Sequence, residues 1–144
     1  FPARRWILSV PENEETKILM YEMTYKLINI YNLEKSDDWN WFEDILTYDN
    51  AIIPLAIFHA AEFFEDDIFF RVAIESSEFL ESITMKSGYF KPVGSKGWYR
   101  KGEICADFAQ QSVDVMGMVL LFFKAYEVTK NKKYLNKMFQ SYMW

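Results

Sequence analysis

The sequence predicts an all-α fold of antiparallel αα-hairpins, and three observations support this fold class. Apolar residues recur at helical spacing over most of the 144 residues. Two helical segments are apolar around almost their entire circumference, whereas the segment after each of them has one apolar stripe. A long loop rich in aromatic and charged residues precedes each of the two apolar segments. We therefore expect a single all-α domain over residues 1–144, in which interior and exterior helices alternate.

The first helix is expected over residues 12–33, and the glutamates in its first turn suit the positive end of the helix dipole. A surface helix packs on the core through its apolar stripe. The predicted stripe consists of Met20, Met23, Leu27 and Ile30, widened by Tyr21, Tyr25 and Ile28.

The second helix, over residues 49–64, and the fourth, over residues 110–129, are the predicted interior helices, because they have almost no polar face. Pro54 is expected in the first turn of the second helix, where its missing N–H costs no helical hydrogen bond.

The third and fifth helices are amphipathic, and we therefore expect them on the outside. Asp66 and Asp67 are predicted to cap the third helix, which would end near Thr84. The fifth helix would begin near Lys132.

Short connections join each interior helix to the next exterior one, whereas the loops that lead into the interior helices are long. Antiparallel packing would place both long loops at one end, over the N-termini of the interior helices. This is the layout of an αα-hairpin toroid with a site at one end. An α-solenoid shares the helix pairing but usually has shorter loops.

The two loop–helix–helix units, residues 34–84 and 85–144, share this architecture without sharing sequence. Two interior helices cannot close a ring. We therefore expect the chain to be a fragment of a larger toroid; the alternative is self-association through the exposed apolar helices.

Composition argues against several kinds of site. The net charge of −5, with no large Lys or Arg cluster, disfavours nucleic-acid binding, which depends on neutralising phosphates. Cys105 is the one cysteine and His59 the one histidine, so neither an internal disulfide nor a Cys/His zinc site is expected. The longest apolar run, residues 115–123, is far shorter than the roughly 20 residues of a membrane span. We expect a cytoplasmic protein without a cofactor, a metal or a membrane partner.

The two long loops carry the residues that point to a ligand. The first contains residues 39–44 (WNWFED) and ends on residues 48–50 (YDN), whereas the second contains residues 97–100 (GWYR) and leads to paired glutamines at 110 and 111. Aromatic rings are costly to expose to water, and carboxylates beside them are typical of a surface that binds a hydroxylated ligand.

These motifs resemble a bacterial family of (α/α)6-toroid, six-hairpin glycosidase-like proteins, whose members are often assigned as glycosyltransferases or occur beside or fused to them. Residues 39–50, with Pro54-Leu55-Ala56 after them, carry the first part of the resemblance. Residues 92–94 and 97–100, followed by Gln110-Gln111, are similar to the next loop and helix start of the family. The resemblance covers the chain from Trp39 onward, which is less than half of a complete toroid.

The chain also departs from the family pattern. Members often place an acid before the paired glutamines and a proline after them, whereas here the residues are Ala109 and Ser112, and Asp114 is the next acid. The resemblance implies a carbohydrate-processing hydrolase or transferase, and this departure puts its activity in doubt.

Glu43 and Asp49 are the predicted catalytic residues. Glycoside hydrolysis needs one protonated acid and one carboxylate that acts as base or nucleophile. Asp107 or Asp114 would supply a partner from the second unit. The structural alternative is that Asp49 only caps its helix and that Asp44 is solvated.

The predicted substrate-binding residues would stack on sugar rings or bind their hydroxyl groups. They are Trp39, Trp41, Asn50, Trp98, Tyr99, Arg100, Gln110 and Gln111. Arg100 would clamp a carboxylate or phosphate of a charged sugar, or would pair with a local acid. The aromatic residues would otherwise pack the loops on the core, an interpretation that we favour for Phe42 and Tyr48. His59 lies within an apolar helix and is expected to be a core histidine.

The sequence therefore predicts a carbohydrate-binding and carbohydrate-processing protein that performs acid–base chemistry on a glycan. The alternative is a non-catalytic helical interaction module or a lectin-like module.

Overall fold

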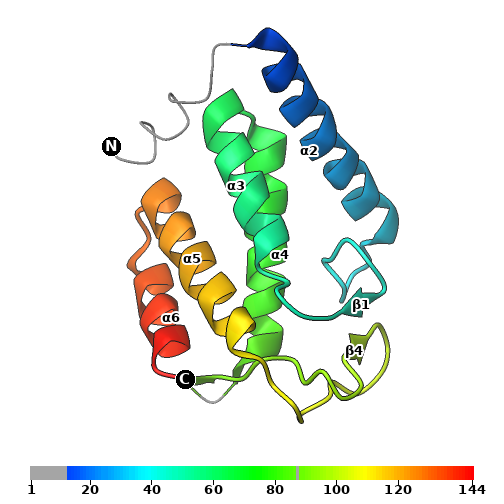
Figure 1. Cartoon of the computed structure of the whole chain (residues 1–144), viewed down its shortest axis with the longest axis vertical. Helices are drawn as coiled ribbons and strands as arrows, with labels where there is room; N and C mark the ends of the chain where they lie inside the picture. Colours follow the sequence, from blue (N-terminus) through cyan, green and yellow to red (C-terminus); the bar gives the residue numbers. More distant parts are fainter. Residues whose placement is uncertain (1–12, 87) are drawn as a thin grey trace.

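The computed structural model describes residues 13–86 and 88–144 and is mostly helical (Figure 1), which confirms the all-α class. The described helices are α2 (Glu14–Glu34), α3 (Ile52–Phe64), α4 (Asp67–Thr84), α5 (Ser112–Thr129) and α6 (Lys132–Tyr142). Four strands of two residues each accompany them: β1 (Ile45–Leu46), β2 (Met85–Lys86), β3 (Tyr89–Phe90) and β4 (Tyr99–Arg100). Glu12, the predicted start of the first helix, lies outside the described residues.

The helices form two hairpins, α3 with α4 and α5 with α6, which are joined by the packing of α3 against α5 (Figure 1). Both hairpins turn in the same way. Glu65 and Lys130 end α3 and α5 in the left-handed conformation, with φ of 53° and 59°. The next residues, Asp66 and Asn131, then cap α4 and α6 through their side-chain oxygens. The predicted Asp66 cap is thereby confirmed.

The core lies where α3, α4 and α5 meet. Its fully buried side chains include Ile57 and Phe58 of α3, Leu80 of α4, and Leu121 and Phe122 of α5. Helix α6 buries only two residues, as expected for an exterior helix, whereas α4 buries a long stripe. This stripe contains the apolar residues that the sequence pattern indicated, and α3, α2 and the first long loop cover it.

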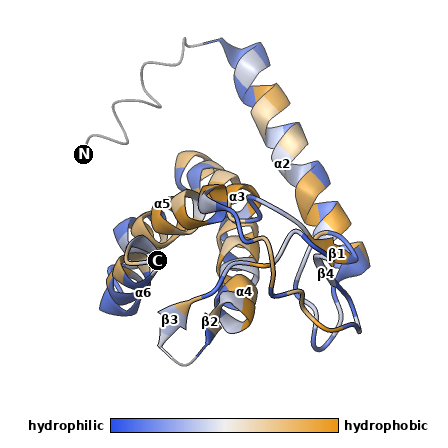
Figure 2. Ribbon diagram, turned by 60° about the horizontal axis from the view of Figure 1, so that its bottom comes forward, coloured by the Kyte–Doolittle hydropathy of each residue, from blue (hydrophilic) through white to orange (hydrophobic). Residues whose placement is uncertain are grey.

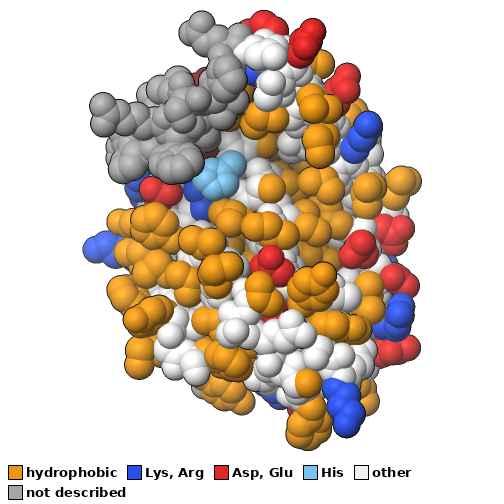
Figure 3. Space-filling model, in the orientation of Figure 1, with side chains coloured by type: hydrophobic (Ala, Val, Ile, Leu, Met, Phe, Trp, Pro, Cys, Tyr) orange, Lys and Arg blue, Asp and Glu red, His pale blue; other side chains and the backbone are white. Residues whose placement is uncertain are grey.

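One face of the interior helices remains exposed. Apolar side chains gather over α3 and α5 in Figure 3, and a small acidic area lies among them. The exposed apolar residues of these two helices include Ile52, Met116, Leu120 and Phe123. Figure 2 shows the contrast with α6, whose outer side is hydrophilic.

Lys124 of α5 is an exception to the apolar character of the interior helices. It is 2% exposed, and its Nζ lies 2.6 Å from Glu62 Oε2 of α3. Burial of nearby His59 lowers the pKa of its imidazole, and the Lys124 charge lowers it further. The ion pair joins the two interior helices toward their C-termini, far along α3 from the long loops.

Helix α2 packs through a face that overlaps only partly with the predicted stripe. Its buried residues are Thr24, Ile28 and Tyr31, whereas Met23 is 59% exposed and Ile30 is 43% exposed. The prediction is correct in part, since Ile28 is buried and Leu27 packs against the core. Met23 and Ile30 lie off this face, because apolar residues surround most of the helix and their spacing does not select one face.

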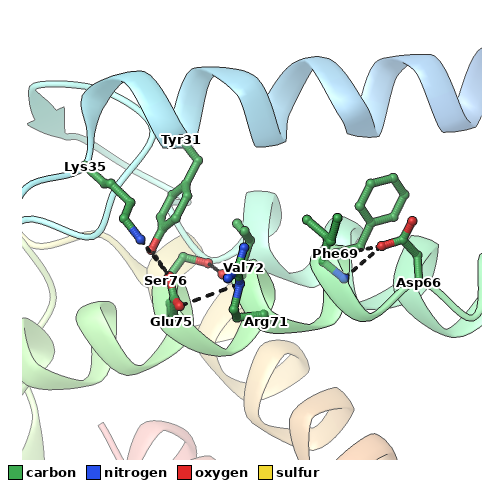
Figure 4. A network of polar contacts seen from close by, with 9 residues as sticks. Tyr31, Lys35, Asp66, Phe69, Arg71, Val72, Glu75 and Ser76 are labelled. Atoms are coloured by element: carbon green, nitrogen blue, oxygen red, sulfur yellow. Dashed lines mark hydrogen bonds and ion pairs between the residues drawn. The ribbon is translucent and has the colours of Figure 1, made fainter.

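A polar contact fixes the orientation of α2 instead. The Tyr31 hydroxyl donates a 2.7 Å hydrogen bond to Glu75 of α4, and Lys35 and Arg71 approach the same carboxylate (Figure 4). Burial and the Glu75 charge raise the pKa of Tyr31 well above that of a free tyrosine.

No helix in the described part of the chain is both long enough and apolar enough to cross a bilayer.

We expect Tyr31→Phe to lower the free energy of unfolding by about 1–2 kcal/mol, because the buried bond to a charged acceptor is lost while the ring contacts remain. Urea unfolding followed by circular dichroism measures this loss. Tyr25→Phe is the matched control, since Tyr25 is 49% exposed on the same helix. Equal midpoints for the two variants would show that the Tyr31 bond does not anchor α2.

Candidate functional site

The two long loops form one layer at the N-terminal ends of α3 and α5, as the sequence predicted. Strand β1 of the first loop pairs antiparallel with β4 of the second, with Ile45 opposite Arg100 and Leu46 opposite Tyr99 (Figure 2). Just outside this ladder, the Lys101 N–H donates a 2.8 Å hydrogen bond to the Asp44 carbonyl. The loops of the two units are therefore held together by their backbones.

Trp39 and Trp41 lie beneath this layer and are 2% and 1% exposed. The Trp39 Nε1 donates a 2.7 Å hydrogen bond to the Glu43 carbonyl, and both indoles pack on Phe79 of α4. Neither ring presents a face that a sugar could reach in this structure. Their arrangement matches the alternative in which they pack the loop on the core.

Tyr48 and Trp98 form an aromatic pair on the outside of the layer. Their ring centroids are 6.1 Å apart, and Tyr48 is 59% exposed, so the expectation that Tyr48 packs in the core is wrong. Trp98 is half-buried and has a φ of 62°, a conformation that residues other than glycine rarely adopt. Tyr99, next to it, turns inward and packs edge-on against Trp39.

Asp49 lies where the first loop meets α5. Its backbone N–H donates a 2.8 Å hydrogen bond to Oδ1 of Asp114, which lies in the first turn of α5. Asp49 has a φ of 51°, in the left-handed region. Asn50 supports this conformation, because its side-chain amide donates to and accepts from the backbone of Thr47. The predicted ligand residue Asn50 is therefore engaged in shaping the turn.

The Asp49 side chain does not cap α3. The N-cap position is Ala51, and no side chain caps this helix. The Asp49 carboxyl group instead lies against Gly117 of α5, where an added Cβ would be 2.8 Å from Asp49 Oδ1. Within the described residues it forms no side-chain hydrogen bond or ion pair. The capping alternative for Asp49 thus does not explain its orientation.

The two carboxyl groups have unusual electrostatics. Asp114 is 5% exposed, and its Oδ2 has no hydrogen-bond partner among the described residues. The pKa of Asp114 is raised to about 6, chiefly by burial; the bond from the Asp49 N–H opposes this rise, and the Asp49 charge adds to it. Burial also raises the pKa of Asp49. Carboxyl groups with raised pKa values are suited to carry a proton near neutral pH.

Three unfavourable features therefore meet at one carboxyl group. A left-handed aspartate is strained, a carboxyl group half removed from water is unpaired, and a glycine inside a helix costs about 1 kcal/mol relative to alanine. Such combinations are typical of functional sites.

The remaining predicted site residues are distributed around this centre. Arg100 pairs with Asp44 at 3.6 Å, as in the alternative of a local ion pair. Gln110 donates to the Asp107 carbonyl, and Gln111 occupies the N-cap position of α5 without a side-chain cap.

Glu43 is exposed, and no described contact joins its side chain to Asp49. The structure brings Asp49 together with Asp114, which the sequence offered only as one of two partners in the second unit. It also places Gly117 beside Asp49. A lone glycine in an apolar helix was the available signal, since a conformational cost of this kind usually has a packing reason.

Within residues 13–86 and 88–144, no group of three or more His, Cys, Asp or Glu side chains is arranged to hold a metal ion.

Comparison of the chain with family models, with curated proteins and with solved structures finds no match.

The raised pKa of Asp114 predicts how stability depends on pH. The unfolded chain releases the Asp114 proton at lower pH than the folded protein does. The stabilisation that the raised pKa of Asp114 gives the folded protein is therefore fully present below about pH 4 and is lost as pH rises through about 6. A rise in pKa from 3.8 to about 6 corresponds to at most about 3 kcal/mol. We expect Asp114→Asn to flatten the fall in unfolding free energy between pH 4 and pH 7.

Urea unfolding of both proteins at four pH values across this range tests the prediction. Comparing slopes rather than absolute stabilities removes any fixed cost of burying an asparagine amide. Parallel curves for the two proteins would show that Asp114 titrates normally.

Proposed function

We propose that the protein binds a carbohydrate at the loop end and processes it by acid–base chemistry, with Asp49 as the residue that transfers the proton. The observation that carries this proposal is the partly buried Asp49 carboxyl group, which lies against Gly117 and has no partner among the described residues. Beside it in the chain is the aromatic pair of exposed Tyr48 and half-buried Trp98. A carboxyl group with a raised pKa is the kind of acid that protonates a glycosidic oxygen.

In this proposal the aromatic pair provides the binding surface. Tyr48 precedes Asp49 in the chain, and the Trp98 ring lies 6.1 Å from that of Tyr48. Such rings pack against the C–H face of a sugar, and the tyrosine hydroxyl can form a hydrogen bond at the edge. Arg100 is already paired with Asp44, which favours a neutral sugar over the acidic one that the sequence suggested.

Asp114 has a supporting role in the proposal. Its carboxylate accepts the Asp49 N–H and so holds the strained backbone of Asp49, while its own Oδ2 is buried away from ligand. Glu43, exposed on the same loop as Asp49, remains the predicted second carboxylate. The reaction would then use Asp49 as acid and Glu43 as base or nucleophile.

We also propose that the two hairpins are part of an (α/α)6 toroid of the six-hairpin type. The support is the packing of α3 against α5, with the loops gathered at one end and one apolar face of both helices exposed (Figures 1 and 3). In a toroid, further interior helices would cover this face. Any transferase activity would belong to that larger assembly.

The alternative is a lectin-like module that binds sugar without turnover. The burial of Trp39 and Trp41 favours this alternative, because fewer side chains are then available to bind a substrate. Asp49→Asn separates the two functions. In an enzyme, this variant would keep its sugar affinity and lose turnover. In a lectin-like module, which has no turnover to lose, the variant could change only the sugar affinity.

Tryptophan fluorescence during titration with a panel of mono- and oligosaccharides tests the site. We expect a saturable change with one class of sugar, because Trp98 lies at the site. Tyr48→Ala should weaken that binding about tenfold, which corresponds to about 1.4 kcal/mol, a reasonable value for one stacked ring.

Tyr89→Ala is the matched control, since Tyr89 is a 56% exposed tyrosine on the separate β2–β3 hairpin. It should leave the affinity unchanged. A flat response to every sugar, or equal losses in the two variants, would contradict a carbohydrate site at Tyr48 and Trp98.

A further inference from the structure

Asp49 touches α5 at two positions one helical turn apart. Asp114 accepts a hydrogen bond from the Asp49 backbone N–H, and Gly117 lies against the Asp49 carboxyl group. Residues three apart lie on the same face of a helix, so α5 presents one face to Asp49. The contact with Asp114 has a structural explanation, because it gives the Asp49 backbone N–H a hydrogen-bond acceptor. The second involves a residue that helices generally avoid.

The space beside Gly117 is defined by two neighbours. A Cβ at this position would lie 2.8 Å from Asp49 Oδ1 and 3.2 Å from the Cβ of Ala51. The first distance is shorter than real Cβ contacts, so the carboxyl group would have to move. The second is tighter than most real Cβ contacts, so Ala51 would have to move by a few tenths of an ångström. The side chain that residue 117 lacks would therefore occupy the position of the Asp49 carboxyl group.

Gly117 also has an ordinary helical backbone, since it does not belong to the glycines with positive φ. Its conformation therefore does not require glycine. The requirement comes from the space beside it, which the Asp49 carboxyl group fills and the Ala51 Cβ borders.

We propose that Gly117 is a positioning residue for Asp49: by lacking a side chain, it provides the seat on α5 in which the Asp49 carboxyl group lies. This inference rests on the proposed role of Asp49 at the carbohydrate site. The seat keeps the carboxyl group against the helix and away from bulk water, which maintains its affinity for a proton.

The charged surroundings of this seat are simple. Asp114 on α5 is the charged group that interacts with Asp49, and its negative charge opposes ionisation of the pair. In the second loop, Arg100 pairs with Asp44, and Lys101 Nζ donates to the Glu34 carbonyl. Displacing the carboxyl group from the seat would therefore change its titration mainly through exposure to water.

Gly117→Ala tests the seat. Carboxyl carbon NMR of labelled aspartate should show the Asp49 midpoint falling by at least half a pH unit, because the displaced carboxylate is better hydrated. Sugar affinity in the fluorescence titration should stay unchanged, as for Asp49→Asn, because the Tyr48–Trp98 pair that binds the sugar is not altered. Met116→Ala, at a 58% exposed position next to Gly117 in sequence, is the control and should shift neither quantity.

A second variant separates the seat from simple crowding. Ala51→Gly combined with Gly117→Ala removes the contact at 3.2 Å and leaves the one with Asp49. Glycine is tolerated at the N-cap position that Ala51 occupies. If Gly117→Ala acts on Asp49, the double variant keeps the altered titration. If it acts only by crowding Ala51, the double variant regains wild-type behaviour and the inference is overturned.

The NMR measurement needs no ligand, so the two proposals can fail separately. An Asp49 midpoint that shifts in Gly117→Ala, in a protein that binds no sugar, would support the seat and reject the carbohydrate site. Sugar binding with an unmoved Asp49 midpoint would keep the carbohydrate site and reject the seat. Should Gly117→Ala fail to fold, the double variant with Ala51→Gly supplies the same readout.

Discussion

The hydrogen bond from the Asp49 N–H to the Asp114 carboxylate joins the two units at the point where both interior helices begin. Helices α3 and α5 lie side by side, and their first turns must be aligned for the loops above them to meet. The bond makes that alignment specific, because a shift of α5 by one residue would turn Asp114 away from the first loop. The β1–β4 ladder and the Lys101–Asp44 bond then extend the same junction across the layer.

The opposite end of the molecule is simpler. There each hairpin closes with a left-handed residue followed by an Asp or Asn cap, a device that needs only two residues and no contact between hairpins. The Lys124–Glu62 pair is the polar link between α3 and α5 toward that end. The two hairpins thus have the same turn at this end and differ from each other in the long loops at the other end. This division is common where a regular scaffold carries a binding site.

Much of the helical framework could be predicted from the sequence, because periodicity and cap residues are local signals. The ends of α4 and the position of Pro54 follow from such signals. The buried face of α2 could be predicted only in part, since a bond from Tyr31 to a residue far along the chain helps to select it. The strands were not predicted from the sequence, because a strand of two residues is too short to show the alternation of polar and apolar residues. The Asp49–Asp114 hydrogen bond could not be predicted for a different reason: α3 and α4 separate its two residues along the chain, so no local pattern connects them.

The burial of Trp39 and Trp41 has a consequence for ligand affinity. Long loops usually lose conformational entropy when they close on a ligand, and that loss is subtracted from the binding free energy. Here the two indoles fix the first loop on α4, and the β1–β4 ladder fixes the second loop on the first. The loop end is therefore preorganised. In the proposed carbohydrate site, less of the binding free energy would then be lost to ordering these loops.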